Sequence, residues 1–439
     1  MSSGGQSRWL AILTGAVISA AFLGPGTITT AARAGAGHHL GLLWTLVFAT
    51  LACLVLQEAS ARSTVVSGRT LGEALRRRYP TGVPALVMTS LVAGAILLGC
   101  AAYEAGNILG GVAGAELALP WPKSVLTLVS GALAALLLWS GDTRRVTTVL
   151  GALVGVMGVA FLVTAALLRP LPAEVLRGLS VPSLPPGSEW LALGLVGTTV
   201  VPYNLFLGSG LARGSDLAET RFGLAVAIGL GGLISMAVVV VGSAVDGEFG
   251  FDRLAAVLAG ELGPWAATFF ALGLFAAGFS SAVTAPLAAA ITARGLFGRS
   301  SDDPRWAATG WNFRGVWIAV LAVGLLVGLS GFQPVPAIVV AQALNGALLP
   351  VVAVFLFVVM NDRSQLGTSV NGPFANLVLA LVVVLTTLLG TRGMVAAASR
   401  ALDRPDFLTS AVFGPIAALV AVLVVGWMVV EIRRQKRSA

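Results

Sequence analysis

Apolar runs of about 20 residues recur along the whole chain, with short polar segments between them. A helix needs about 20 apolar residues to cross the hydrocarbon core of a bilayer. A short amphipathic helix is also expected over residues 252–262. The pattern therefore predicts an all-α polytopic membrane protein with twelve transmembrane helices, at residues 9–34, 40–61, 83–113, 122–140, 146–168, 189–213, 221–243, 264–291, 314–331, 334–359, 373–391 and 409–430.

Two of the predicted helices contain a proline break. The first carries Leu-Gly-Pro-Gly-Thr at residues 23–27, and the sixth carries Thr-Val-Val-Pro-Tyr-Asn at residues 199–204. Proline lacks the backbone N–H and clashes with the preceding turn, so each helix is expected to break near mid-membrane. Broken backbone persists in hydrocarbon only where protein or a water-filled cavity satisfies the freed groups. One break in each half of the chain indicates a transporter's binding site.

Five spans, an odd number, separate the start of the first interrupted helix from the start of the second. The second set of helices must then enter the membrane from the opposite side, which makes it an inverted repeat of the first. The sequence thus predicts two five-helix units, two additional helices and a basic tail. The divisions are residues 1–168, an outer proline-rich connector at 169–188, the second unit at 189–359, and 360–439.

Composition and charge agree with a membrane protein. Hydrophobic residues make up 57% of the 439 positions and charged residues 10%, whereas soluble domains carry about 25% charged residues. With a cytoplasmic N-terminus, nineteen of the 27 Lys and Arg residues lie on the cytoplasmic side. The net charge of +8 therefore indicates orientation in the plasma (inner) membrane with both termini cytoplasmic, and no nucleic-acid partner. We favour a monomer.

A few polar residues lie inside the apolar runs. Glu104 is the one carboxylate placed deep in hydrocarbon, where a charge is costly and usually functional; the alternative is a protonated structural glutamate. Gln342, in the tenth span, either lines a cavity or bonds to a neighbouring helix. Near the inner end of the second span, Glu58 precedes Arg62 by one helical turn, which predicts an interfacial ion pair.

The remaining reactive side chains do not indicate catalysis. Cys53 and Cys100 both fall in apolar runs and are expected to be packing residues. The only histidines, His38 and His39, fall in a short outer loop without acid or cysteine partners. Because no histidine–acid or nucleophile–base set is present, we expect neither an enzyme nor a cofactor.

Several motifs agree in order with one family. They are Gly-Pro-Gly-Thr at 24–27, Leu-Gln-Glu-Ala-Ser-Ala-Arg at 56–62, Val-Pro-Tyr-Asn-Leu-Phe-Leu-Gly at 201–208, Ala-Gly-Phe-Ser-Ser at 277–281 and Ala-Gln-Ala-Leu-Asn-Gly-Ala-Leu-Leu-Pro at 341–350. Over residues 8–365 the chain resembles the Nramp divalent-metal transporters. This resemblance implies a LeuT-type inverted-repeat fold, alternating access and divalent metal cargo.

The family's metal site is not intact in this chain. Its helix-one acid and asparagine positions hold Gly24 and Thr27, and its helix-six methionine and histidine positions hold Val201 and Tyr203. Glu104 matches the family's helix-three glutamate, while the acid three residues earlier is Ala101. The resemblance therefore implies a divergent branch that lacks the usual metal-site Asp, Met and His.

The resemblance, with the two breaks, nominates the site residues. Thr198 falls where the family offers a backbone carbonyl, and Gln342 matches its helix-ten amide. Thr27 and Gln342 are the candidate metal ligands, and Glu104 is the candidate for proton coupling. The expected substrate-binding residues are Gly24, Thr27, Thr198, Val201, Tyr203, Asn204 and Gln342.

Loss of the acid leaves three functions open. Neutral oxygens could hold a hydrated hard dication weakly, which would give divalent-metal transport with altered selectivity. An uncompensated half-helix N-terminus would instead favour a small polar or anionic solute, carried without proton–metal coupling. A non-transporting sensor on the same scaffold is the third possibility.

Overall fold

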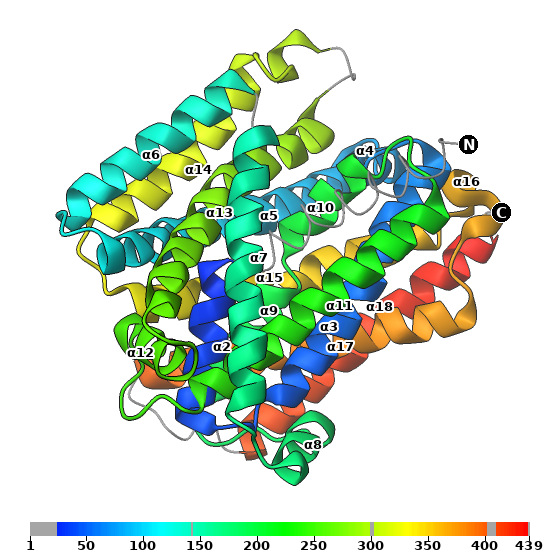
Figure 1. Cartoon of the computed structure of the whole chain (residues 1–439). Coiled ribbons are helices and arrows are strands. Elements are labelled where there is room, and N and C mark those ends of the chain that lie inside the picture. Colours follow the sequence, from blue (N-terminus) through cyan, green and yellow to red (C-terminus); the bar gives the residue numbers. More distant parts are fainter. Residues whose placement is uncertain (1–23, 142–143, 299–302, 402–409, 438–439) are drawn as a thin grey trace, which may run out of the picture.

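The computed structural model describes residues 24–141, 144–298, 303–401 and 410–437. These residues fold into a bundle of helices with no strand among them (Figure 1). The elements are α2 (Pro25–His38), α3 (Leu43–Ser67), α4 (Leu71–Arg78), α5 (Gly82–Ala118), α6 (Lys123–Ser140), α7 (Arg144–Leu167), α8 (Pro172–Ser180), α9 (Glu189–Thr199), α10 (Pro202–Leu211), α11 (Leu217–Gly242), α12 (Phe251–Leu262), α13 (Trp265–Phe297), η1 (Pro304–Trp306), α14 (Trp311–Leu329), α15 (Pro334–Met360), α16 (Arg363–Leu366), η2 (Gly367–Ser369), α17 (Pro373–Ala401) and α18 (Ser410–Arg437).

Ten segments of the described chain are long and apolar enough to cross a membrane. Each overlaps one of the predicted spans from the second to the eleventh, and α12 matches the predicted amphipathic helix. The first half of the first predicted span lies outside the described residues, and α2 forms its second half. The twelfth segment falls in α18, which is not among the ten. The protein is therefore a multi-span helical membrane protein, and the total of twelve stays a prediction.

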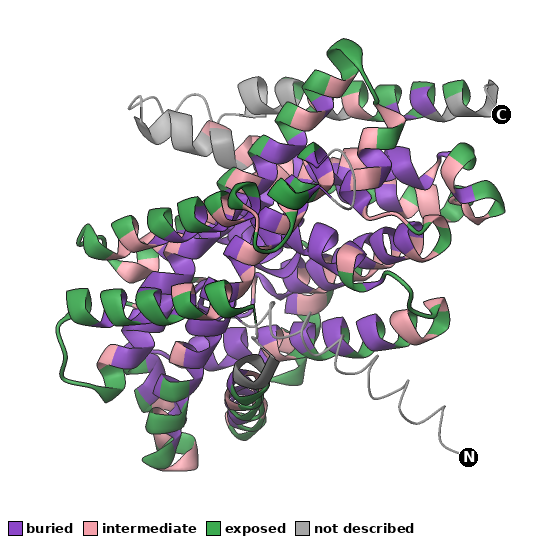
Figure 2. Cartoon of the chain, turned by 90° about the horizontal axis from the view of Figure 1, so that it is seen from above, coloured by how far each residue is buried: buried purple, intermediate pink, exposed green. Residues whose placement is uncertain are grey.

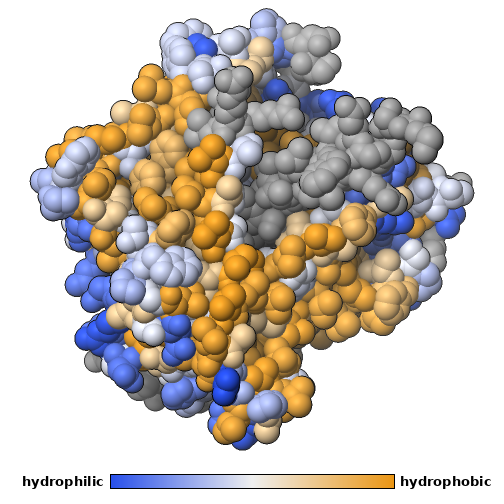
Figure 3. Space-filling model, viewed as in Figure 1, coloured by the Kyte–Doolittle hydropathy of each residue, from blue (hydrophilic) through white to orange (hydrophobic). Residues whose placement is uncertain are grey.

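The outside of the bundle is strongly apolar. Leu86, Leu136 and Leu326, on α5, α6 and α14, are 66–68% exposed. Figure 3 shows hydrophobic residues over much of the face seen in that view, and Figure 2 shows buried residues gathered in the middle of the bundle. A continuous apolar surface of this kind is suited to contact with lipid, because soluble monomers rarely expose large contiguous apolar patches to water.

The sixth predicted helix is interrupted where the sequence predicts. Helix α9 ends at Thr199 and α10 begins at Pro202, with Val200 and Val201 between them. Proline is favoured at the first position of a helix, where its missing N–H would be unpaired anyway. The same rule places Pro25 at the start of α2, directly after Gly24. Figure 1 shows α2 and α9 in the middle of the bundle, with α6 and α14 on one side and α17 and α18 on the other.

Close approach of helices depends on glycine. A Cβ on Gly278 of α13 would lie 2.5 Å from the backbone nitrogen of Gly111 on α5. One turn further along α5, a Cβ on Gly114 would lie 2.5 Å from the nitrogen of Phe275. Small residues let membrane helices pack backbone against backbone, where dispersion contacts and not hydrophobic burial hold them together. Helix α5 thus forms a tightly packed axis beside α13.

Three short α-helices of the described chain, α4, α8 and α16, are absent from the sequence expectations, and the first two have clear start signals. Helix α8 lies within the proline-rich connector, where Pro172 occupies its first turn. Helix α4 begins with a capping box, in which the Glu73 carboxylate accepts a bond from the Thr70 nitrogen at 2.8 Å. Both helices are shorter than a membrane span, so a search for long apolar runs does not detect them.

The ion pair predicted between Glu58 and Arg62 is confirmed, with Nε and Oε1 3.1 Å apart. Arg221, at the start of α11, also donates to Glu58 Oε1 at 2.6 Å. Arg62 in turn donates to Asn371 Oδ1 at 2.6 Å. This network ties α3 to α11 and to the segment before α17 at one end of the bundle.

Candidate functional site

The start of α2 and the end of α9 meet in space through one hydrogen bond. The hydroxyl oxygens of Thr27, in the first turn of α2, and Thr198, in the last turn of α9, lie 2.8 Å apart. These residues are 171 positions apart in the chain, and both are at most 1% exposed. The start of α2 and the end of α9 therefore lie side by side in the core.

The interruption between α9 and α10 releases backbone groups at this meeting point. In a continuous helix the Thr198 carbonyl would accept a bond from the residue four positions later, but that residue is Pro202, which has no N–H. The Tyr103 hydroxyl donates to this carbonyl at 3.4 Å, a long bond that leaves its second lone pair available. Helix α2 contributes the opposite polarity, because its first N–H groups point toward the break.

Gln342 of α15 lies in a space lined by glycines from three other helices. A Cβ on Gly26 of α2 would overlap the Gln342 Nε2 atom, and a Cβ on Gly106 of α5 would lie 3.8 Å from it. A Cβ on Gly194 of α9 would lie 3.6 Å from the Gln342 Cβ. The side chain is fully buried, and neither amide atom has a hydrogen-bond partner among the described residues. Buried amides are nearly always bonded, so this one is placed to bind a ligand or water.

Ser281 of α13 lies beside Gly24, at the start of α2. A Cβ on Gly24 would lie 3.3 Å from the Ser281 hydroxyl oxygen. Ser281 is 2% exposed, and within the described chain its hydroxyl has no partner. Gly24 itself caps α2 without any side-chain bond to the helix N-terminus. The position that the resemblance assigns to an acid therefore holds Gly24, which has no side chain and lies next to the Ser281 hydroxyl.

Tyr103 brings Tyr203 and Glu104 near the first group, because its ring contacts Tyr203 and Glu104 follows it in the chain. The rings of Tyr103 and Tyr203 meet edge to face with centroids 5.5 Å apart, which connects α10 to α5. Glu104 is fully buried, and its stem packs on α14, where a Cβ on Gly324 would lie 2.5 Å from the Glu104 Cγ. Neither carboxylate oxygen has a hydrogen bond of good geometry within the described residues. Tyr103 thus links this group to the Thr198 carbonyl.

The remaining predicted residues lie in α10 or at its start. Val201 precedes Pro202, is 1% exposed, and its carbonyl accepts a bond from the Asn204 nitrogen at 3.1 Å. Asn204 is 2% exposed, and both atoms of its side-chain amide lack partners in the part of the chain that is described. The structure thus gathers Gly24, Thr27, Thr198 and Gln342 around the breaks, while Tyr203 and Glu104 lie together on the α5 side.

The donor set is neutral oxygen. Hydroxyl, carbonyl and amide groups surround the breaks, and the described residues contain no group of three His, Cys, Asp or Glu side chains placed to hold a metal ion. Hard ions such as Mg2+ accept such oxygens and keep part of their water shell, whereas Mn2+ and Fe2+ gain more from carboxylate and imidazole.

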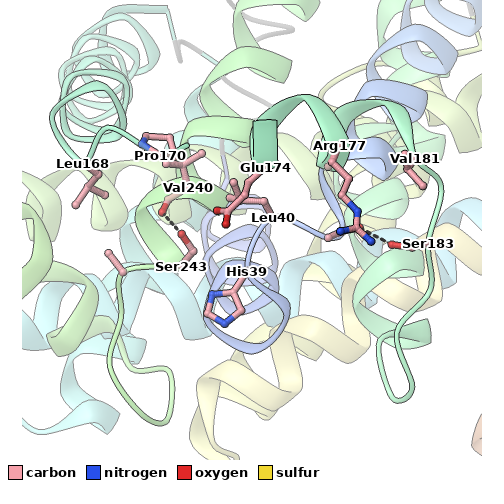
Figure 4. A pocket seen from close by; sticks show the side chains of 13 residues that line it. His39, Leu40, Leu168, Pro170, Glu174, Arg177, Val181, Ser183, Val240 and Ser243 are labelled. Atoms are coloured by element: carbon pink, nitrogen blue, oxygen red, sulfur yellow. Dashed lines mark hydrogen bonds between the residues drawn. The ribbon is translucent and has the colours of Figure 1, made fainter. Parts of the chain in front are cut away.

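An outer pocket lies at the far end of α2 (Figure 4). Its volume is about 610 Å3, and it lies between α8, the end of α11 and the loop after α2. His39 occupies the left-handed backbone region with φ 48° and lies opposite Glu174 in this view. The Ser183 hydroxyl donates to the Gly41 carbonyl at 3.1 Å on the other side of the pocket. The pocket brings solvent to the end of the half-helix that begins at the central site.

Comparison with known proteins identifies the family. The model of the Natural resistance-associated macrophage protein-like (Nramp) family matches residues 15–396. The chain belongs to the Nramp family. This membership, together with the ten apolar spans, makes it an integral membrane transporter and not an enzyme.

Curated relatives of this Nramp chain are metal transporters. The Divalent metal cation transporter MntH of Deinococcus radiodurans is 30% identical over 390 residues, which cover 84% of this chain and 85% of the relative. The Metal transporter Nramp3 of Oryza sativa subsp. japonica is 26% identical over 457 residues, covering 96% and 81%.

Solved structures share the fold. The manganese transporter of Eremococcus coleocola has a TM-score of 0.74 at 20% identity, and the match covers 99% of this chain and 97% of that one. Mhp1, a nucleobase-cation-symport-1 family transporter, has a TM-score of 0.54 at 17% identity, covering 95% and 92%. These neighbours support the LeuT-type fold that the resemblance implies.

Sequence reasoning missed two features of this Nramp site. Ser281 appeared only within the motif at 277–281 and was not nominated as a site residue, and Tyr103 was not singled out. The hydroxyl-rich Phe-Ser-Ser segment at 279–281 was the available signal for the first. For Tyr103, the only signal was its position beside Glu104.

Proposed function

We propose that this chain is a secondary active transporter that carries divalent cations by alternating access and selects them differently from its metal-transporting relatives. The observation that carries the proposal is the 2.8 Å bond between Thr27 and Thr198, which brings the start of α2 and the end of α9 to one point lined by neutral oxygens. We assign the Thr27 and Ser281 hydroxyls, the Thr198 carbonyl and the Gln342 amide to the cation.

The architecture in this proposal is a pair of inverted five-helix units. Residues 1–168 form the first unit and residues 189–359 the second, joined by the outer connector at 169–188. Residues 360–439 add two further helices and a cytoplasmic tail, which gives twelve spans with both termini on the cytoplasmic face of the inner membrane. Two sequence features support this arrangement. The start of the sixth span lies five spans after the start of the first, and most Lys and Arg residues fall on the predicted cytoplasmic side.

Selectivity follows from the missing carboxylate. At close range an ionised ligand is a strong attraction in a low-dielectric site, and it offsets the cost of removing water from the cation. Without the carboxylate, a cation that keeps several bound waters loses less binding free energy than a cation that must shed its waters to bind. We therefore expect weak, partly hydrated binding of Mg2+ and related hard ions, with little preference for Mn2+.

Access to the site requires movement. Thr27, Thr198 and Gln342 are at most 1% exposed, so a cation can reach them only when the surrounding helices move apart. We assign the outer pocket at His39 and Glu174 as the vestibule through which a cation approaches when the outer side opens.

The test is uptake into liposomes that contain the purified full-length protein. Mg2+, Mn2+, Ca2+, bicarbonate and neutral amino acids are supplied in turn, with empty liposomes as the control. We expect uptake of Mg2+ at least comparable with Mn2+. Strong preference for Mn2+ would contradict the altered selectivity, and binding without uptake of any solute would indicate a sensor.

A second candidate is transport of a small anionic solute. The observation that favours it is the start of α2, which has no acidic residue in its first turn and no side-chain cap. The positive end of the helix dipole at this N-terminus attracts an anion, although Pro25 has no N–H and the Thr27 and Ile28 nitrogens already donate to the Gly24 carbonyl. Uptake of bicarbonate or a carboxylate in the same assay, with no cation uptake, would support this candidate.

Glu104→Gln is expected to remove the pH dependence of transport. The carboxylate is the one acid buried beside the site within the described chain, and glutamine keeps its shape while it cannot exchange a proton. The measurement is initial uptake between pH 5.5 and 8. The matched control is Glu116→Gln, at the other end of α5, where the carboxylate pairs with Lys123 at 3.6 Å. An unchanged pH profile in Glu104→Gln would leave that glutamate with a packing role only.

A further inference from the structure

A basic pocket lies at the end of the bundle near α4, away from the transport site. Its volume is about 440 Å3. The polar lining comes from three segments: the residue after α3, the helix α4, and the turn after α10. The lining side chains are Arg69, Glu73, Arg76, Arg77, Pro80 and Arg213.

The single acid in the pocket is already engaged. Glu73 accepts the α4 cap bond from the Thr70 nitrogen at 2.8 Å, and it pairs with Arg213 at 3.5 Å. Arg69, Arg76 and Arg77 make no ion pair with any described residue. The pocket therefore retains an excess of positive charge.

One arginine of the pocket is partly buried without a partner. The Nη1 atom of Arg76 is shielded from solvent and makes no hydrogen bond within the described chain. Burying a guanidinium nitrogen without an acceptor costs free energy, so such a group is normally found where an acceptor binds. Arginine presents a planar fork of donors that matches the oxygens of phosphate.

The surroundings of the pocket place it at the lipid boundary. Two residues after Pro80, α5 begins at Gly82, and its first two turns expose Val83 and Leu86 at 72% and 68%. Before Arg69, the last turn of α3 exposes Val66 at 39%. A basic pocket next to an outward-facing apolar surface fits a phospholipid, whose acyl chains cover the apolar side while the headgroup enters the pocket.

We propose that this pocket binds a phosphate group, and that the headgroup of an anionic phospholipid supplies it. The proposal does not depend on the identity of the transported solute. Occupancy would strengthen the connection between α4 and α10, because Arg213 follows α10 and its Nε already donates to the Gly68 carbonyl at 3.1 Å. Helix α10 begins with Pro202 at the second break, so the lipid would stabilise one position of a helix that lines the transport site.

The test measures lipid binding to the full-length protein in phosphatidylcholine nanodiscs with increasing phosphatidylglycerol. Thermal stability and the number of retained lipids in native mass spectrometry are the two readouts. A double variant, Arg76→Gln with Arg77→Gln, is expected to raise the half-saturating phosphatidylglycerol fraction about tenfold or more, because charge-assisted bonds to the phosphate are lost.

The matched control removes two arginines outside the pocket. Arg363→Gln with Arg433→Gln changes the net charge equally at two exposed positions and is expected to shift half-saturation less than twofold. Equal weakening in both double variants would overturn the pocket, because the effect would then be general electrostatics. Binding as tight as wild type in Arg76→Gln/Arg77→Gln would also overturn it.

A second variant and a second ligand complete the test. Arg76→Lys keeps the charge and is expected to weaken binding several-fold, because lysine cannot make the bidentate contact. This variant is used if the double variant does not fold. Unchanged lipid affinity in Arg76→Lys would overturn the proposal. Inorganic phosphate is titrated separately at constant ionic strength. Stabilisation by phosphate without any response to phosphatidylglycerol would overturn the lipid assignment and make soluble phosphate the ligand.

Discussion

Gly24→Asp is expected to raise the affinity for Mn2+ about 10- to 100-fold, the range over which metal sites respond to changes around their ligands. Gly24 caps α2, and its backbone is extended with φ −74° and ψ 172°. Aspartate is a preferred residue at such a position, because its carboxylate can accept bonds from the first N–H groups of the helix. The same carboxylate would lie beside the Ser281 hydroxyl, which is 3.3 Å from the added Cβ and can rotate to donate to it.

Isothermal titration calorimetry with Mn2+ and Mg2+ measures this change. Gly24→Asn is the matched control, because asparagine has nearly the same shape and caps helices equally well but carries no charge. We expect little change in Mn2+ affinity for the asparagine variant. The placement of the site at the start of α2 is wrong if aspartate and asparagine give the same Mn2+ affinity.

Gly197→Ala is expected to lower the free energy of unfolding by about 1–3 kcal/mol or more, the usual cost of overpacking. A Cβ on Gly197 would overlap the Gln342 carbonyl oxygen and lie 2.9 Å from the Gly346 Cα, so it would meet the backbone of α15. Backbone cannot move aside as a flexible side chain can. Helices α9 and α15 would have to separate, which would also move Gln342 away from Thr198.

The matched control is Gly229→Ala on α11, where no atom lies within 4 Å of the added Cβ. Alanine is the better helix former by about 0.5–1 kcal/mol in the interior of a helix, so this variant should be neutral or slightly more stable. Thermal unfolding in detergent, monitored by circular dichroism, compares the two. Equal melting temperatures for the two variants would contradict the close packing of α9 on α15.

The two variants probe different levels of the structure. Gly24→Asp adds one charge to a site whose backbone is already arranged, so its effect should appear in metal binding and not in stability. Gly197→Ala leaves every ligand in place chemically but changes the distance between the helices that carry them. Its effect should appear in stability first, and in binding as a consequence.

The sequence by itself determined the long apolar helices and the interruption at Pro202. The length of an apolar run and the missing N–H of proline are local properties, so ten spans and the break between Thr199 and Pro202 followed directly from the chain. The pairing of Glu58 with Arg62 was equally accessible, because residues four apart share one face of a helix. Short helices such as α4 and α8 were not predicted, because they are shorter than the apolar runs from which the helices were predicted.

Only the tertiary structure decided which groups share the site. The bond from Thr27 to Thr198, the approach of Ser281 to Gly24 and the position of Gln342 among glycines all join helices that are distant in the chain. Such contacts depend on how far small residues let the helices approach and on how each helix is rotated about its axis. The hydrophobic pattern of one sequence does not specify these quantities, because a lipid-spanning helix can be apolar on every face.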